Sequence, residues 1–263
     1  MSATATRQTI QLPIDHGVVG LRGLSPERSR FELEYALERG STANSVLFEA
    51  ADDQLAVLVH PPGAAYGDVF LPALAALVPG GDQPLLVVVG HVNPNRVALL
   101  RMLAEAYSRL ELIASNAGAK LLQELWSLRK PAPPGQENAQ PPLPDLPAIR
   151  VIRHEQDLPL GFGRSLQLLP APTPRWPGGL LAFETSLGLL MSDKFFSAHL
   201  CTAVWAESNR SSTEEERRHF YDCLIAPMAR QVDALVERLE DLEIRTIAPG
   251  HGPAIEVSWR SLL

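Results

Sequence analysis

The alternating strand and helix pattern in the middle of the chain constrains the fold most strongly. An apolar run at 84–89 predicts a buried strand, with helical spacing of apolar residues before it at 69–78 and after it at 96–109. A second strand is expected at 110–114 and another helix at 117–128. Strands that alternate with helices usually form a parallel or mixed sheet whose outer face is covered by those helices.

Segments rich in predicted strands flank this central section. Short β-type runs, broken by Gly, Pro and Asp, are expected at 8–22, 30–36, 44–49 and 55–59. Later strands are expected at 149–154, 165–169, 179–183, 187–192 and 244–248. Two mixed sheets with helices outside, an αββα sandwich in the α/β class, accommodate this order of elements.

One long amphipathic helix is expected before the last strand. Its apolar face would carry Tyr221, Leu224, Met228, Val232, Leu235 and Leu239. Thr213, followed three residues later by Glu216, has the spacing of a capping box at the start of this helix.

A proline-rich segment at 130–147 interrupts the pattern. It holds seven prolines in eighteen positions, and proline supports neither a helix interior nor a strand ladder. Because strand patterning resumes afterwards, the segment is expected to be a loop inserted within one domain that spans 1–263.

Charge and composition exclude several classes of protein. The net charge is −7 with no long basic run, which argues against a nucleic-acid partner. The apolar runs are far shorter than the roughly 20 residues that span a bilayer, and no apolar signal segment opens the chain. Cys201 and Cys223 lack metal or redox spacing and are expected to be free thiols. The chain is therefore expected to be soluble and cytoplasmic.

Several short motifs occur in a fixed order over about 220 residues. They read ELEY at 32–35 with GSTANS at 40–45, GHVNPNR at 90–96, PAPTPRWP at 170–177, LMSDKFFSAH at 190–199 and APGHG at 248–252. Together they resemble the metallo-β-lactamase-like domain of flavodiiron proteins, most closely the diflavin type of photosynthetic organisms. The resemblance implies the αββα fold, a di-iron centre and the reduction of O₂ to water with electrons from NAD(P)H. It also implies flavodoxin-like and flavin-reductase domains, and these, with their FMN and FAD, are expected to lie outside this chain.

The iron ligands of that family are four histidines, one glutamate and two aspartates, one of which bridges the metals. Transferred motif by motif, the seven positions fall on His91, Asn93, Asn95, Arg96, Arg175, Lys194 and His251. Only the first and last keep a ligand side chain, and the bridging aspartate falls on Lys194. Protonated Arg and Lys have no lone pair to donate, and they repel a metal cation. The chain is therefore expected to share the fold of the family but not its di-iron centre.

One alternative register stays open, because Asp193 directly precedes Lys194 and would take the bridging position if the register is shifted by one. A single metal on His91, Asp193 and His251 is then conceivable. Otherwise the basic side chains Arg96, Arg175 and Lys194 are expected to hold chloride or another anion, or to pair with nearby carboxylates. In the favoured register, Trp176, Asp193 and His199 are expected beside the site without direct ligation.

Three functions are compatible with these residues. The first is the core of an oxidoreductase that acts with a ligand-bearing partner isoform, as a heterodimer or homodimer, and serves as a photoprotective electron sink. The second is a scaffold that binds a partner and catalyses nothing. The third, a hydrolase, needs a metal-bound hydroxide, and the substituted ligand positions count against it.

Overall fold

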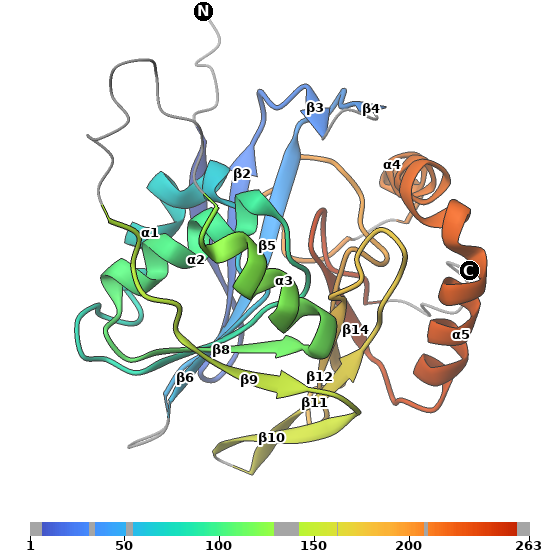
Figure 1. Cartoon of the computed structure of the whole chain (residues 1–263). Helices are drawn as coiled ribbons and strands as arrows, with labels where there is room; N and C mark the ends of the chain where they lie inside the picture. Colours follow the sequence, from blue (N-terminus) through green and yellow to red (C-terminus); the bar gives the residue numbers. More distant parts are fainter. Residues whose placement is uncertain are drawn as a thin grey trace, which may run out of the picture.

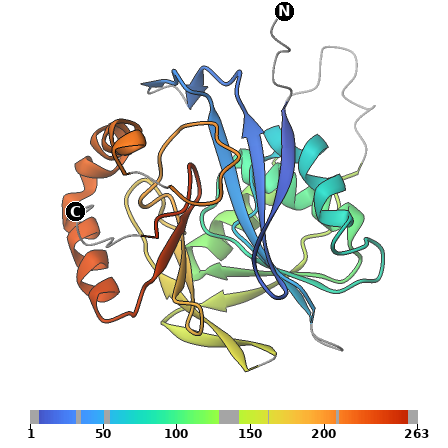
Figure 2. The same cartoon turned by 180° about the vertical axis from the view of Figure 1, so that it is seen from behind.

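Two β-sheets packed face to face form the centre of the molecule, and helices cover both outer faces (Figure 1). The computed structural model describes residues 7–31, 35–50, 55–128, 142–161, 163–207 and 210–256. The view from behind shows the same layers, with the blue N-terminal strands in front of the helices that cover the first sheet (Figure 2). The αββα sandwich predicted from the sequence is confirmed.

The first sheet has seven strands within the described residues, in the order β1-β2-β5-β6-β7-β8-β9. They are β1 (Gln8–Asp15), β2 (Val18–Ser25), β5 (Ser41–Phe48), β6 (Ala56–Val59), β7 (Leu85–Val88), β8 (Leu110–Ser115) and β9 (Ala148–Ile152). The pairs from β1 to β6 are antiparallel, and those from β6 to β9 are parallel. The short strands β3 (Arg30–Phe31) and β4 (Tyr35–Ala36) pair with each other.

Three helices cover the outer face of this sheet: α1 (Gly67–Ala75), α2 (Pro94–Ala106) and α3 (Asn116–Trp126). Leu85 and Val87 of β7 pack in the core beneath these helices, whereas Leu86 and Val88 pack in the core between the sheets. Because β7 is buried on both faces, its sequence is a continuous apolar run rather than an alternating one. No helix in the described ranges is both long enough and apolar enough to span a membrane.

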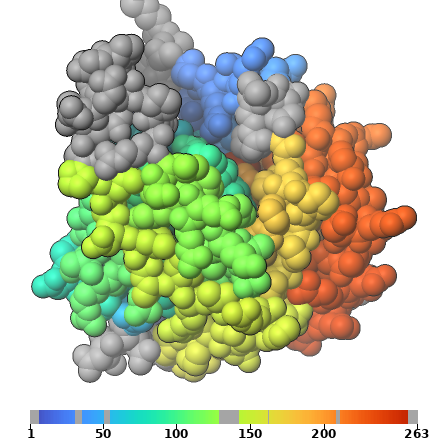
Figure 3. Space-filling view, in the orientation of Figure 1, coloured from blue at the N-terminus to red at the C-terminus, as the bar shows by residue number. Residues whose placement is uncertain are grey.

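The second sheet has five strands in the described part of the chain: β10 (Gln156–Gly161), β11 (Arg164–Pro170), β12 (Leu180–Glu184), β13 (Leu189–Asp193) and β14 (Thr246–Pro249). The helices α4 (Glu214–Phe220) and α5 (Ala229–Glu240) pack on its outer face. In the space-filling view, green residues lie at the centre of the visible face and orange residues form its right-hand side, with yellow residues between them (Figure 3).

The prediction of one continuous C-terminal helix is wrong. A π-helical turn (Tyr221–Ile225) and a 3-10 turn (Ala226–Met228) separate α4 from α5. Pro227 lies in this interruption, where it removes a backbone donor and crowds the preceding turn. Buried residues of α4, of the interruption and of α5 all pack in the second core.

The predicted capping box is also wrong. Thr213 is the N-cap residue of α4, but its hydroxyl does not bond to the helix backbone. Thr213 Oγ1 instead donates to Glu207 Oε2 at 2.5 Å, and Glu216 accepts from Arg39. Tertiary partners have replaced both local contacts.

Smaller differences concern the strands. The run 8–22 is a hairpin whose turn contains Gly17 at φ 69°. The strand β10 had not been predicted, because Pro159 and Gly161 weaken its strand pattern.

Most of the proline-rich segment 130–147 lies outside the described residues. Cys201 and Cys223 are free, as expected.

Candidate functional site

A polar cavity of about 280 Å³ brings most of the motif residues together. Its polar lining comprises Arg28, Asn44, Tyr66, His91, Asn93, Asn95, Arg96, Asp193, Lys194 and His251. Six of the seven ligand-equivalent positions are among them. The cavity lies where β7, β13 and β14 end, because residues that directly follow these three strands form its wall.

His91 is held between two fixed partners. Its Nδ1 lies 2.6 Å from Asp193 Oδ2, and its Nε2 lies 3.3 Å from the amide nitrogen of Asn93. Asn93 Oδ1 accepts from the backbone N–H of Arg96 at 2.8 Å and so caps α2, which leaves the amide N–H₂ facing the imidazole. His91 therefore donates from Nδ1 and accepts at Nε2. Burial, followed by the nearby Arg96 cation, lowers the pKa of His91 to about 3.

His251 has the same pattern of partners. Its Nδ1 lies 2.6 Å from the carbonyl oxygen of Thr42, to which it donates. The lone pair is then on Nε2, which lies 3.0 Å from Nζ of Lys194. Burial and the charge of Lys194 hold the pKa of His251 well below its usual range. For both retained histidines, the lone pair on Nε2 faces a side chain at a substituted ligand position. The side chain is that of Asn93 for His91 and that of Lys194 for His251.

Asp193 and Lys194 both face the cavity although they are neighbours in the chain. A regular strand would point them to opposite faces, but Asp193 has φ 50° and the pairing of β13 with β14 shifts register there. Glycines make room for this turn. A Cβ on Gly90 would lie 2.9 Å from the Asp193 carboxyl carbon, and one on Gly250 would lie 2.6 Å from its backbone oxygen.

Asp193 is the carboxylate of the cavity. Burial raises its pKa, but His91 and Arg96 outweigh burial and hold that pKa well below the ordinary value. Arg96 Nη2 lies 3.7 Å from Asp193 Oδ1, and its Nη1 donates to the carbonyl of Pro61. Asp193, expected beside the site, thus bonds directly to one retained histidine and pairs with a cation.

The remaining expected site residues lie farther out. Arg175 is not among the residues that line the cavity, and its guanidinium lies 5.7 Å from the ring centroid of Trp176. Trp176 packs in the core beneath α4 and α5. His199 reaches the site through His251, since their ring centroids are 4.4 Å apart, and its Nδ1 lies 2.7 Å from Ser41 Oγ.

His60 and Arg28 are two examples of residues at the site that had not been assigned to it from the sequence. His60 is buried, and its Nε2 donates to the Leu180 carbonyl at 2.9 Å. A Cβ on Gly90 would lie 2.7 Å from the His60 ring. The sequence held one signal for His60. It directly follows β6, and His91 comes shortly after β7, the strand that pairs in parallel with β6. Arg28 lines the cavity as an additional cation, and no motif pointed to it.

The relatives of this chain share a name. The chain is 38% identical over 255 residues to putative diflavin flavoprotein A 6 from Nostoc sp., an alignment that covers 97% of this chain and 41% of that protein. A crystal structure of residues 1–254 of putative diflavin flavoprotein A 5 from Nostoc sp. matches with a TM-score of 0.83 at 34% identity, over 97% of this chain and 94% of that one. The chain belongs to the diflavin flavoprotein A family.

Further comparisons support the same fold. A metal-soaked Flv1 flavodiiron core from Synechocystis sp. matches with a TM-score of 0.84 at 33% identity, over 98% of this chain and 59% of that one. The rubredoxin oxygen:oxidoreductase of Desulfovibrio gigas, at 20% identity and a TM-score of 0.80, shares the fold. No protein-family model matches the sequence. The chain spans about two fifths of the length of the curated diflavin flavoproteins it matches.

The donor set of the cavity does not fit two iron ions. The lining residues offer two imidazoles and one carboxylate, and each imidazole lone pair faces the nitrogen of an amide or an amine. Arg28, Arg96 and Lys194 line the same cavity, and two like charges 4 Å apart repel by about 4 kcal/mol at an effective dielectric constant near 20. Among the described residues, no group of three or more His, Cys, Asp or Glu side chains is arranged to hold a metal.

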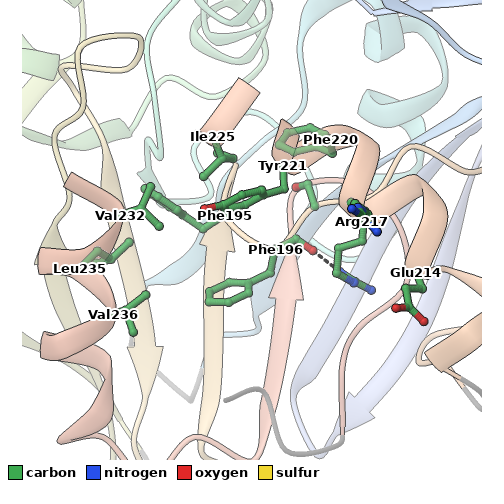
Figure 4. A pocket seen from close by; sticks show the side chains of 12 residues that line it. Phe195, Phe196, Glu214, Arg217, Phe220, Tyr221, Ile225, Val232, Leu235 and Val236 are labelled. Atoms are coloured by element: carbon green, nitrogen blue, oxygen red, sulfur yellow. Dashed lines mark hydrogen bonds between the residues drawn. The ribbon is translucent and has the colours of Figure 1, made fainter. Parts of the chain in front are cut away.

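A second cavity, of about 220 Å³, is separate from this constellation (Figure 4). Phe195, Phe196 and Phe220 lie on one side of it, and apolar residues of α5 lie on the other. Arg217, at its edge, donates to the Phe196 carbonyl and pairs with Glu207 at 2.8 Å. The lining is mostly apolar, and this cavity contains none of the ligand-equivalent residues.

Proposed function

We propose that this chain is the core domain of a diflavin oxidoreductase that reduces O₂ to water with electrons from NAD(P)H and serves as a photoprotective electron sink. The names of its relatives, diflavin flavoproteins and flavodiiron cores, support this reaction class. FMN and FAD would be bound by further domains of the complete protein, which is proposed to act in the cytoplasm.

The contacts of the two retained histidines support a second part of the proposal, which concerns the metal content of the site. Asn93 Nδ2 faces Nε2 of His91, and Lys194 Nζ faces Nε2 of His251. A metal would have to displace both nitrogens and then lie beside Arg96. We infer that this core holds no di-iron centre and acts together with a ligand-bearing isoform in a heterodimer, or within a homodimer. Asn93 and Lys194 on one ring nitrogen, with Asp193 and the Thr42 carbonyl on the other, then hold the two imidazoles in fixed tautomers.

Metal analysis and oxygen consumption test this function together. Protein purified without chelator after growth in iron-supplemented medium is expected to contain far less than one iron or zinc per chain. The full-length protein is expected to consume little O₂ alone, and to raise the NAD(P)H-dependent rate of a ligand-bearing isoform when the two are mixed. Two irons per chain would contradict the metal-free site.

The alternative of a scaffold predicts a different outcome. A scaffold would bind the ligand-bearing isoform without changing its rate of O₂ reduction. A hydrolase of the metallo-β-lactamase superfamily would need a metal to generate hydroxide, so measurable zinc and metal-dependent hydrolysis would be required.

The cavity is further proposed to hold an anion such as chloride. Three cationic side chains, Arg28, Arg96 and Lys194, line it against the single carboxylate Asp193. Lys194→Met removes one of these charges and is expected to weaken bromide binding at least about tenfold, since a single charge pair at close range is worth a few kcal/mol. The melting temperature, followed during a bromide titration at constant ionic strength, reports this affinity.

Two further variants make this anion test specific. Lys120→Met removes an exposed lysine of α3 and is expected to leave bromide binding unchanged. Arg175→Met is expected to have a smaller effect than Lys194→Met, because Arg175 does not line the cavity. Unchanged bromide affinity in Lys194→Met would contradict the anion site.

A further inference from the structure

We propose that the amine of Lys194 binds carbon dioxide as a carbamate. The chain contains three lysines, Lys120, Lys130 and Lys194, among 23 basic residues. The last is 6% exposed and lies in a polar cavity. A buried lysine beside other cations is the setting in which an amine acts as a nucleophile rather than as a surface charge.

The surroundings of the amine select a small, neutral electrophile. Nζ lies 3.0 Å from Nε2 of His251, and the cavity that contains it measures about 280 Å³. A charged or bulky carbonyl compound would have to lose its hydration to reach a residue buried to this degree. Carbon dioxide is small and uncharged, and it adds only three atoms to the side chain.

The reaction balances with groups present at the site. The ammonium first loses a proton, which passes to solvent through the cavity that Lys194 lines. The amine lone pair then forms an N–C bond to carbon dioxide, one C=O π pair moves onto oxygen, and the nitrogen releases a second proton. Lysine and carbon dioxide thus give a carbamate and two protons, which pass to solvent, and the side-chain charge changes from +1 to −1.

The charge of the cavity favours this product. With its histidines neutral, the cavity holds Arg28, Arg96 and Lys194 against Asp193, an excess of two positive charges. Conversion of Lys194 to a carbamate brings the sum to zero, so the carbamate and a bound anion such as chloride are alternative states of the cavity that exclude each other. The guanidinium groups of Arg28 and Arg96 are fixed donors of the kind that pair with a carboxylate-like group.

Carbon-13 NMR of the full chain in ¹³C-labelled bicarbonate tests the proposal. The expected result is one protein-bound carbamate resonance that weakens on acidification, because carbamate formation releases protons. Alkylation of the carbamate before digestion is expected to leave the label on the peptide that contains Lys194. The absence of a resonance, or label only on Lys120, Lys130 or the amino terminus, would overturn the proposal.

Variants provide an independent check. Lys194→Arg keeps a positive charge but has no primary amine, and it is expected to reduce the resonance to background. Lys120→Arg is the matched control and is expected to keep it. If Lys194→Arg does not fold, peptide mapping of the unaltered protein decides alone.

The inference rests on the metal-free cavity of the proposed function, and iron analysis of the same sample keeps the two apart. An iron-free sample without a carbamate overturns only this inference. An iron-loaded sample without a carbamate overturns both.

Discussion

The free energy of unfolding is expected to fall steeply as the pH drops below about 6.5, the ordinary pKa of histidine. Four histidines, His60, His91, His199 and His251, are buried around the cavity. Burial lowers the pKa of His60 to about 4 and, together with Arg96, that of His91 to about 3. The pKa values of His199 and His251 are also held well below the usual range, first by burial.

The sign of the effect follows from proton binding. Below about pH 6.5 the unfolded chain protonates these histidines, whereas the folded chain keeps them neutral until the pH approaches their lowered pKa values. Acid therefore favours unfolding. Each histidine contributes roughly 1.4 kcal/mol per pH unit within this window, so four contribute about 5.5 kcal/mol per pH unit. Total stabilities are commonly about 5–15 kcal/mol, and the protein is thus expected to unfold before about pH 4.5.

Urea unfolding from about pH 8 to about pH 5.5 measures this slope. Asp193 does not contribute in that window, because its pKa is lowered from 3.8 and its stabilisation is lost only at more acidic pH. His154→Gln, a change at an exposed histidine, is expected to leave the slope unaltered. A free energy of unfolding that stays constant between about pH 7.5 and 5.5 would show that these histidines are accessible to protons in the folded state.

The sequence was informative where a signal is local. The apolar run before His91, the helical spacing after Pro94 and the order of the motifs are properties of neighbouring residues, and they located both β7 and one wall of the cavity. An asparagine before a proline also marks the start of a helix. The sequence did not show that the amide of Asn93 faces His91 as well, because that contact depends on how the loop folds back.

Other parts of the site depend on backbone geometry or on distant partners. Asp193 and Lys194 share the cavity because of a positive φ and a shift of register, whereas strand alternation alone would have separated them. His60 contacts Leu180, 120 positions away in the chain. Arg22 is the clearest case, since an arginine within a strand usually indicates a solvent-facing side, yet this one is 1% exposed.

Replacing Arg22 by methionine is expected to lower the free energy of unfolding by roughly 3 kcal/mol. Arg22 Nε donates to Asn44 Oδ1 at 2.7 Å, and Nη2 donates to the carbonyls of Trp205 and Gly252 at 3.1 and 3.3 Å. Nη1 donates to the Val204 carbonyl. The variant leaves these acceptors buried without their charged donor.

Two effects of opposite sign decide how far the free energy of unfolding falls in Arg22→Met. Hydrogen bonds to a charged group contribute about 1.5–3 kcal/mol each, so four of them outweigh the several kcal/mol that it costs to bury a guanidinium. Burial lowers the pKa of Arg22 to about 10, so it remains protonated at neutral pH. For a domain of this size the loss corresponds to a melting temperature lower by roughly 10 °C.

The loss is also expected to reach the cavity. Asn44 Nδ2 donates to the carbonyls of Pro249 and Gly252 at 2.8 and 2.7 Å, so Arg22 and Asn44 together hold the chain on both sides of His251. Arg22→Met should therefore weaken bromide binding as well as stability, whereas Arg230→Met, at an exposed arginine of α5, should change neither. If Arg22→Met lowers the melting temperature but leaves bromide affinity intact, the Asn44 contacts alone are sufficient to position His251, and Arg22 serves only the stability of the fold.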